Sequence, residues 1–119
     1  MSYNISFKVK VEGTNKYIKV GNCEANTTWN VREIITRSTG LEWKNSENNG
    51  LCVDVVPYIK KGLNELQTNP NKYKQYESDN GWGTVCDTIR FFKDILDAWH
   101  IFSVNEYPEI VKVTTFWIE

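Results

Sequence analysis

The sequence is poor in the side chains that most often carry catalysis or bind metals. It holds one histidine, His100, and three cysteines, Cys23, Cys52 and Cys86, without a Cys-x-x-Cys spacing. Scattered cysteines in odd number argue against a disulfide framework and a structural zinc site, and they indicate a reducing interior. On one continuous helix Cys86 and His100 would lie about 21 Å apart, too far for a nucleophile and its base. We therefore expect no catalytic residue, metal or cofactor.

An excess of one charge and a long apolar run are also missing. Fourteen basic against fifteen acidic residues leave a net charge of −1, which disfavours direct nucleic-acid binding because no long-range positive field is present. No apolar run approaches the roughly 20 residues that span a bilayer, so no membrane partner is expected. The start of the chain alternates apolar and polar residues, unlike a signal peptide. We expect a protein that stays in the cytoplasm where it is made.

What the sequence does have is enough apolar side chains for one core. With 119 residues, 40% of them hydrophobic and 13% aromatic, the chain fits a single domain over residues 1–119. Strict alternation and turn residues predict a hairpin over 3–20, followed by an irregular stretch at 22–27. A first helix is expected after Thr28 or Asn30, with an Asn30–Glu33 capping box, and it should stop at Gly40.

The second half predicts two more helices and a strand. After a loop at 45–50, a helix should begin near Asp54, with Pro57 in its first turn. The longest apolar stripe follows Thr84, and a β-rich segment at 110–118 ends the chain. This order predicts an α+β fold: a small, mostly antiparallel sheet, made of the N-terminal hairpin plus the C-terminal strand, with three helices packed on one face.

The Asn-Gly-Trp-Gly-Thr segment at 80–84 is the first candidate site. Flexible residues before a helix can leave backbone N–H groups free to bind an anion at Gly83 and Thr84, and Trp82 could stack on a ring. The acids Glu77 and Asp87 weaken this interpretation. The alternative is a turn that tucks Trp82 into the core.

The second candidate lies around the start of the first helix and consists of Trp29, Arg32 and Arg37. A guanidinium suits bidentate contacts with phosphate or carboxylate, and the indole could hold a ligand ring. The structural alternative is that Trp29 packs as a hydrophobic staple. The acids of the last helix, such as Asp94 and Asp97, are interpreted as solubilising side chains rather than as acid–base groups.

Four segments of the chain resemble a group of small phage and prophage proteins. They are Met1-Ser2-Tyr3-Asn4-Ile5, Asn26-Thr27-Thr28-Trp29-Asn30-Val31, Asn69-Pro70-Asn71-Lys72-Tyr73 and Asn80-Gly81-Trp82-Gly83-Thr84. The group is marked by a Ser-Tyr-Asp-Ile start, an Asn-x-Thr-x-Asn helix start and an Asn-Gly-Trp-Gly-Thr start to the last helix. This chain departs from it at Asn4, where the group has Asp, and in a longer C-terminal strand. The resemblance implies a phage gene product that acts inside a bacterium.

The leading hypothesis is a non-enzymatic binding protein that blunts host defence. It would either sequester a nucleotide-derived signal, with Trp82 and Trp29 on the base and Gly83, Thr84 and Arg32 on phosphate, or dock on a defence protein such as a CRISPR effector through exposed aromatic residues. Two alternatives remain: a small hydrolase that uses carboxylates gathered by the fold, and a structural or regulatory phage protein that forms homo-oligomers.

Overall fold

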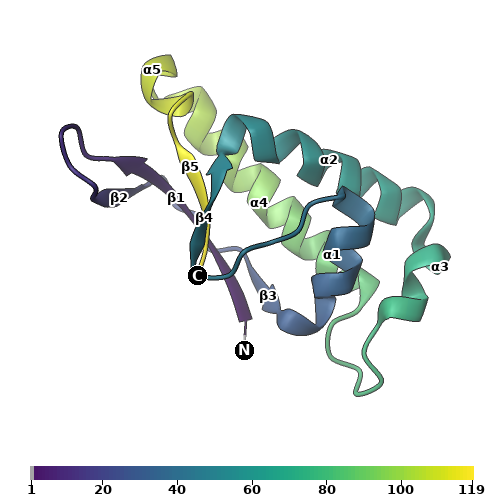
Figure 1. Ribbon diagram of the computed structural model, residues 1–119. Helices are drawn as coiled ribbons and strands as arrows, with labels where there is room; N and C mark the ends of the chain where they lie inside the picture. The colour runs from purple at the N-terminus through teal and green to yellow at the C-terminus, as the bar shows by residue number, and fades with distance from the viewer. Residues whose placement is uncertain (1) are drawn as a thin grey trace.

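One antiparallel sheet with helices on one face forms the protein (Figure 1). The computed structural model describes residues 2–119, and its central strand is β1 (Ser2–Lys10). The start of β1 pairs with β3 (Asn26–Thr28) and its end pairs with β2 (Tyr17–Val20). On its other edge lies β5 (Thr115–Ile118), which pairs in turn with β4 (Glu47–Leu51). The α+β prediction, with the hairpin and the C-terminal strand in one sheet, is confirmed.

Within residues 2–119, three longer helices form the helical layer, and four short helical elements connect them to one another and to the sheet. The longer helices are α1 (Arg32–Thr39), α2 (Cys52–Thr68) and α4 (Val85–Asn105). The short elements are α3 (Pro70–Tyr73), α5 (Pro108–Val111) and the 3-10 turns η1 (Trp29–Val31) and η2 (Lys74–Tyr76). The ring of Phe7 on β1 lies 5.4 Å from that of Trp99 and 6.2 Å from that of Phe102. Helix α4 therefore packs directly on the central strand.

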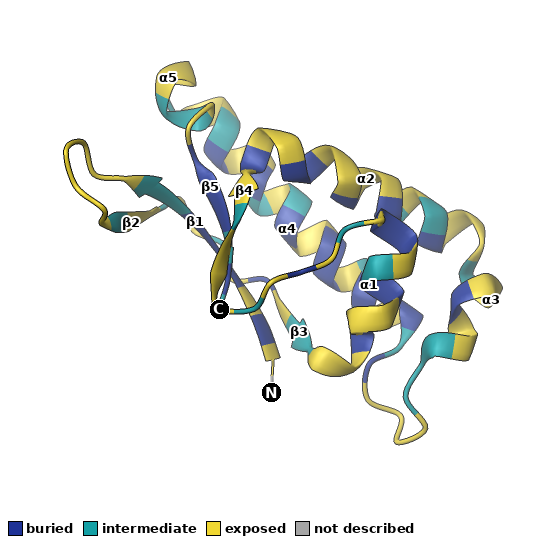
Figure 2. Cartoon of the chain, in the orientation of Figure 1, coloured by how far each residue is buried: buried dark blue, intermediate teal, exposed yellow. Residues whose placement is uncertain are grey.

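The core lies between the sheet and the helices (Figure 2). Alternation on β1 buries its inner face, and the expected α4 stripe is buried or half-buried along its whole length. The fully buried large side chains come from both layers and include Ile5, Phe7, Ile34, Ile35, Ile59, Phe92, Ile95, Phe116 and Ile118. Gly40 ends α1 at φ +79°, as its position predicts.

Several expected boundaries are wrong. The loop expected at 45–50 contains strand β4, and the irregular stretch at 22–27 already includes the first residues of β3. Helix α2 begins at Cys52, whose N–H donates to the carbonyl of Thr114 at 2.9 Å, so Pro57 falls in its second turn. Asp54 caps nothing there, because the N-cap position is Leu51 and no side chain caps it.

The first helix and the C-terminal strand also differ in detail. No Asn30–Glu33 capping box forms, since Thr28 accepts from the N–H of Asn30 to cap η1 instead. The strand expected at 110–118 is shorter, because Pro108 opens the α5 turn. Its tightly buried face carries Phe116 and Ile118.

Candidate functional site

The two segments that carry the sequence-predicted site residues meet at one tightly packed corner. Gly83 adopts φ +86° and is buried against η1. A Cβ atom on Gly83 would lie 2.7 Å from the Cβ of Asn30 and 3.2 Å from Cγ2 of Thr28. Because only glycine fits this approach and this backbone angle, Gly83 fixes the start of α4 against the end of β3.

Carboxylates already occupy the N-terminus of α4. Thr84 Oγ1 accepts from the N–H of Asp87 at 3.1 Å, and Asp87 Oδ2 accepts from the N–H of Thr84 at 3.0 Å, which is a capping box. The N–H of Val85 donates to Glu77 Oε2 at 2.7 Å. The hydrogen bond from the Thr84 backbone is the main reason that the pKa of Asp87 lies below its usual range. Phosphate bound at Gly83 and Thr84, which stays a prediction, would have to displace these two carboxylates.

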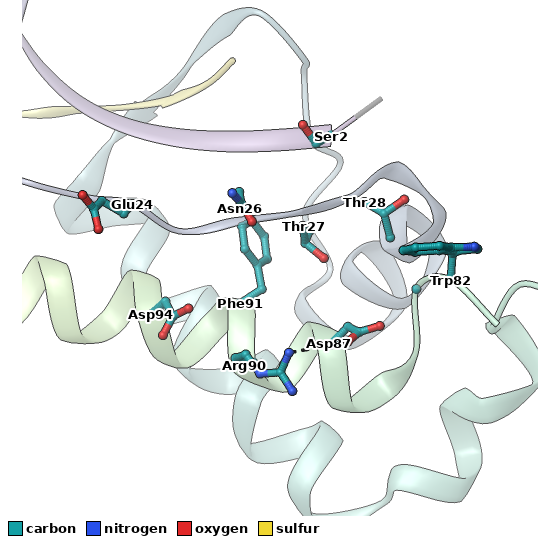
Figure 3. A pocket seen from close by; sticks show the side chains of 11 residues that line it. Ser2, Glu24, Asn26, Thr27, Thr28, Trp82, Asp87, Arg90, Phe91 and Asp94 are labelled. Carbon is teal, nitrogen blue, oxygen red and sulfur yellow. Dashed lines mark ion pairs between the residues drawn. The ribbon is translucent and has the colours of Figure 1, made fainter.

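Trp82 is not tucked into the core. Its side chain is 69% exposed, and it lies in the largely exposed segment that precedes α4. Its backbone N–H donates to Asn80 Oδ1 at 2.9 Å. The indole borders a groove of about 610 Å³ that runs between the β3 segment and α4 (Figure 3).

Trp29 and Arg32 line a different hollow, of about 370 Å³. We call it the aromatic hollow, and its lining residues are Tyr3, Trp29, Arg32, Glu42, Trp43, Lys44, Asn45 and Glu47. The Tyr3 ring lies 6.1 Å from that of Trp29 and 5.9 Å from that of Trp43. Trp29 keeps 37% of its surface exposed, so it packs on Tyr3 and still offers indole surface to a ligand.

Charge in the aromatic hollow is mixed. An Arg32 nitrogen lies 3.7 Å from the Glu42 carboxylate, and both side chains are more than half exposed. Such an exposed pair is weak, so the guanidinium can exchange Glu42 for another anion. Burial raises the pKa of Tyr3, and the positive charge of Arg32 partly opposes this. The Tyr3 hydroxyl therefore keeps its proton at neutral pH.

Asn45 lines the aromatic hollow, and the sequence analysis did not single it out. Its Oδ1 is buried, and no donor within residues 2–119 reaches it. The loop that carries it is held by Asn49, whose side chain bonds both the N–H and the carbonyl of Lys44 at 2.9 Å. Ser46 follows at φ +62°. The asparagine-rich stretch at 45–50 predicts only a loop, which gives no sign of this acceptor.

The structure thus divides the predicted site in two. Trp82 and Gly83 line the groove, Trp29 and Arg32 line the aromatic hollow, and the two sets of lining residues share no member. Thr28 faces the groove, whereas the next residue, Trp29, faces the hollow. Thr84 lines neither, since its hydroxyl caps α4.

Comparisons of the chain with protein-family models, with curated proteins and with solved structures find no match. Among the helices of residues 2–119, none combines the length and the apolar character needed to cross a membrane. The phage resemblance therefore rests on the sequence alone, and the functional hypotheses rest on the sequence and on the geometry of the groove and the aromatic hollow.

Proposed function

We propose that this is a non-enzymatic, phage-encoded binding protein that blunts bacterial host defence by sequestering a nucleotide-derived signal in the aromatic hollow. In this arrangement the base stacks on Trp29, and phosphate contacts Arg32 and Lys44. A volume of about 370 Å³ lies in the usual range of roughly 300–1,000 Å³ for small-molecule sites. It suits one nucleotide unit.

The observation that carries this proposal is the unpaired acceptor of Asn45 beside exposed indole surface. A buried oxygen without a donor costs about 1–3 kcal/mol, and an amino group of a base is a donor of the right kind. Stacking of a base on an aromatic side chain contributes about 1–3 kcal/mol more. Stacking becomes available when a flat ring enters the hollow, and the hydrogen bond forms when a shift of the loop that carries Asn45 brings its buried Oδ1 within reach of the amino group.

A thermal-shift scan tests the ligand class. We expect one or more members of a panel of mononucleotides, linear dinucleotides and cyclic dinucleotides to raise the melting temperature, by about 10 °C at a hundredfold excess over Kd. Trp29→Ala and Asn45→Leu should abolish the shift. Trp82→Ala is the matched control, because it removes an exposed indole outside the hollow, and it should retain the full shift. No stabilisation by any nucleotide would contradict the proposal.

The host-defence part of the proposal is tested in bacteria. Expression of the protein should restore phage plating on a strain that carries a nucleotide-signalling defence system. The Arg32→Ala variant should lose this effect while it keeps a normal melting temperature, because the side chain is exposed. Equal protection by Arg32→Ala would separate the biological effect from the hollow.

The hydrolase alternative has one feature in its favour, since Glu24, Asp87 and Asp94 all line the groove. A general acid at neutral pH needs a raised pKa, however, and hydrogen bonds within the helix cap shift the pKa of Asp87 the other way. The groove is better suited to binding than to proton transfer. Homo-oligomer formation stays an alternative that light scattering over a range of concentrations would test.

A further inference from the structure

The groove beside Trp82 is a second surface with its own chemistry. One wall is the β3 strand and the loop before it, with Glu24, Asn26 and Thr28, and the other wall is the N-terminal half of α4 (Figure 3). Trp82 stands at one end, next to Thr28, and Glu24 and Asp94 lie toward the other end (Figure 3). We call this surface the Trp82 groove.

Negative charge dominates the Trp82 groove. Three carboxylates, from Glu24, Asp87 and Asp94, face one guanidinium, that of Arg90. Arg90 already lies 3.8 Å from Asp87, and within residues 2–119 no ion pair forms at Glu24 or Asp94. The two unpaired charges also act on the neighbouring Cys23. Its pKa is raised mainly by burial, and both carboxylates raise it further.

The exposed indole of Trp82, at the other end of the groove, adds an aromatic face to the carboxylates. The neighbouring backbone is held in place, because Gly83 packs tightly against Asn30 and the backbone N–H of Trp82 donates to Asn80 Oδ1. The ring is thus presented to solvent on a fixed backbone. Tryptophan is the best aromatic partner for a cation, and arginine in particular stacks flat on such rings.

We propose that the Trp82 groove docks an extended, arginine-bearing segment of a protein partner. One guanidinium stacks on Trp82 and contacts Asp87, and a second binds between Glu24 and Asp94. Asp94 lies seven positions after Asp87, a rise of about 10 Å along α4. An extended chain covers that distance in about three residues. The fitting segment therefore has two arginines about three residues apart.

Charge also selects against other occupants. A nucleic-acid strand would bring phosphates toward three carboxylates, and only one guanidinium would attract them. The inference goes beyond the nucleotide proposal, because the Trp82 groove and the aromatic hollow share no lining residue. It also gives a chemical basis for the idea of docking on a host defence protein.

A two-dimensional ¹⁵N NMR titration of the full chain tests the proposal. The probe is the capped peptide Gly-Arg-Ser-Ser-Arg-Gly, and the comparison peptide has glutamine in place of both arginines. The five tryptophans each give an indole N–H signal, and Trp82→Phe assigns that of residue 82. We expect the arginine peptide to shift the Trp82 indole and the amides of Glu24 and Asp94, and to leave the Trp29 indole in place.

Variants test the contribution of each end. Trp82→Ala and the double variant Glu24→Gln/Asp94→Asn should each weaken peptide binding about tenfold or more. The matched control is Asp97→Asn/Glu109→Gln, which removes two exposed charges outside the groove and should change Kd less than twofold. Unchanged melting temperatures show that each variant is folded.

Four results with the peptides would overturn the proposal. They are no shift up to millimolar peptide, equal shifts with the glutamine peptide, shifts centred on Trp29, and an equal loss of affinity in the charge control. A single-stranded oligonucleotide that shifts the same signals would also exclude a protein segment as the selected occupant. The Trp29 indole signal reports on the aromatic hollow and not on the Trp82 groove. Failure of peptide binding would therefore not contradict the nucleotide proposal, which the thermal-shift scan tests.

Discussion

Replacement of Gly83 by alanine should destabilise the protein much more than the same change at Gly81. Both glycines have positive φ, +86° at Gly83 and +78° at Gly81. A Cβ at Gly81 would meet nothing within 4 Å, whereas at Gly83 it would lie 2.7 Å from the Cβ of Asn30 and 3.1 Å from its carbonyl carbon. The pair of variants therefore separates backbone strain from steric contact.

The magnitudes follow from the two costs. A left-handed conformation costs an alanine about 1–2 kcal/mol, and this cost applies to both variants. Forced contact inside a packed region adds about 1–3 kcal/mol, and this cost applies only at Gly83, because the contact includes backbone of η1. For a chain of this size 1 kcal/mol shifts the melting temperature by about 4 °C. Gly81→Ala should lower it by about 4–8 °C and Gly83→Ala by about 8–20 °C.

Thermal unfolding followed by far-ultraviolet circular dichroism measures both variants under the same conditions. Equal losses in the two variants would refute the inference that Gly83 locks the start of α4 onto η1. A loss at Gly83 with no loss at Gly81 would refute the strain assigned to positive φ.

Two further predictions concern the contact between α1 and α2 and the stability in acid. Gly62→Ala should lower the free energy of unfolding, because the new Cβ would lie 2.5 Å from Cγ2 of buried Thr39. This steric cost should exceed the helix preference of alanine over glycine, which is about 1 kcal/mol. A variant that is more stable in urea unfolding would contradict this close approach of α1 and α2. The free energy of unfolding should also fall in acid, because folding lowers the pKa of Asp87 and of Glu119. The main cause is the Thr84 backbone hydrogen bond for Asp87 and the hydrogen bond with Lys8 for Glu119. The unfolded chain then binds more protons, so this stability is complete above the ordinary values of 3.8 and 4.5 and is lost as the pH falls through the lower folded values. Urea midpoints between pH 7 and 2.5 should show the loss, and Asp87→Asn, which has no carboxyl group, should lose less.

The elements with a strong local pattern could be predicted from the sequence. The alternation on β1 and the long stripe on α4 depend on each segment's own residues, and the end of α1 depends on one glycine in the left-handed region. In each case the buried face of the element is already visible as a period of two or of about 3.6 residues.

Strand β4 could not be predicted, because its cause lies elsewhere in the chain. Glu47, Asn48, Asn49 and Gly50 have low strand propensity, and β4 exists by pairing with β5, almost 70 residues later, across an irregular register. The start of α2 has a similar origin, since the carbonyl of Thr114, and not a local side chain, accepts from the Cys52 N–H. Long-range backbone pairing overrides the turn chemistry of the asparagine-rich run.

In the candidate sites, too, local groupings could be predicted from the sequence and long-range ones could not. Trp29 and Arg32 are three residues apart at one helix start, so sequence reasoning could group them. Tyr3, Trp43 and Asn45 join them only because β1 and the loop before β4 come together in the fold. The separation of Trp82 from Trp29 is equally a property of the fold, since Thr28 and Asn30 lie directly against Gly83.

Different residues of the Asn-Gly-Trp-Gly-Thr segment therefore have different roles: some position α4, and Trp82 is exposed for binding. Gly83 and Thr84 position α4, one through a close contact and the other through the capping box. Asn80 accepts the hydrogen bond that holds the loop, and Trp82 extends its indole into solvent. Substitutions at Gly83 or Thr84 would change binding through stability, so an affinity measured on them cannot assign a ligand contact. Only changes at Trp82 and at the groove's free carboxylates can test binding without disturbing the corner.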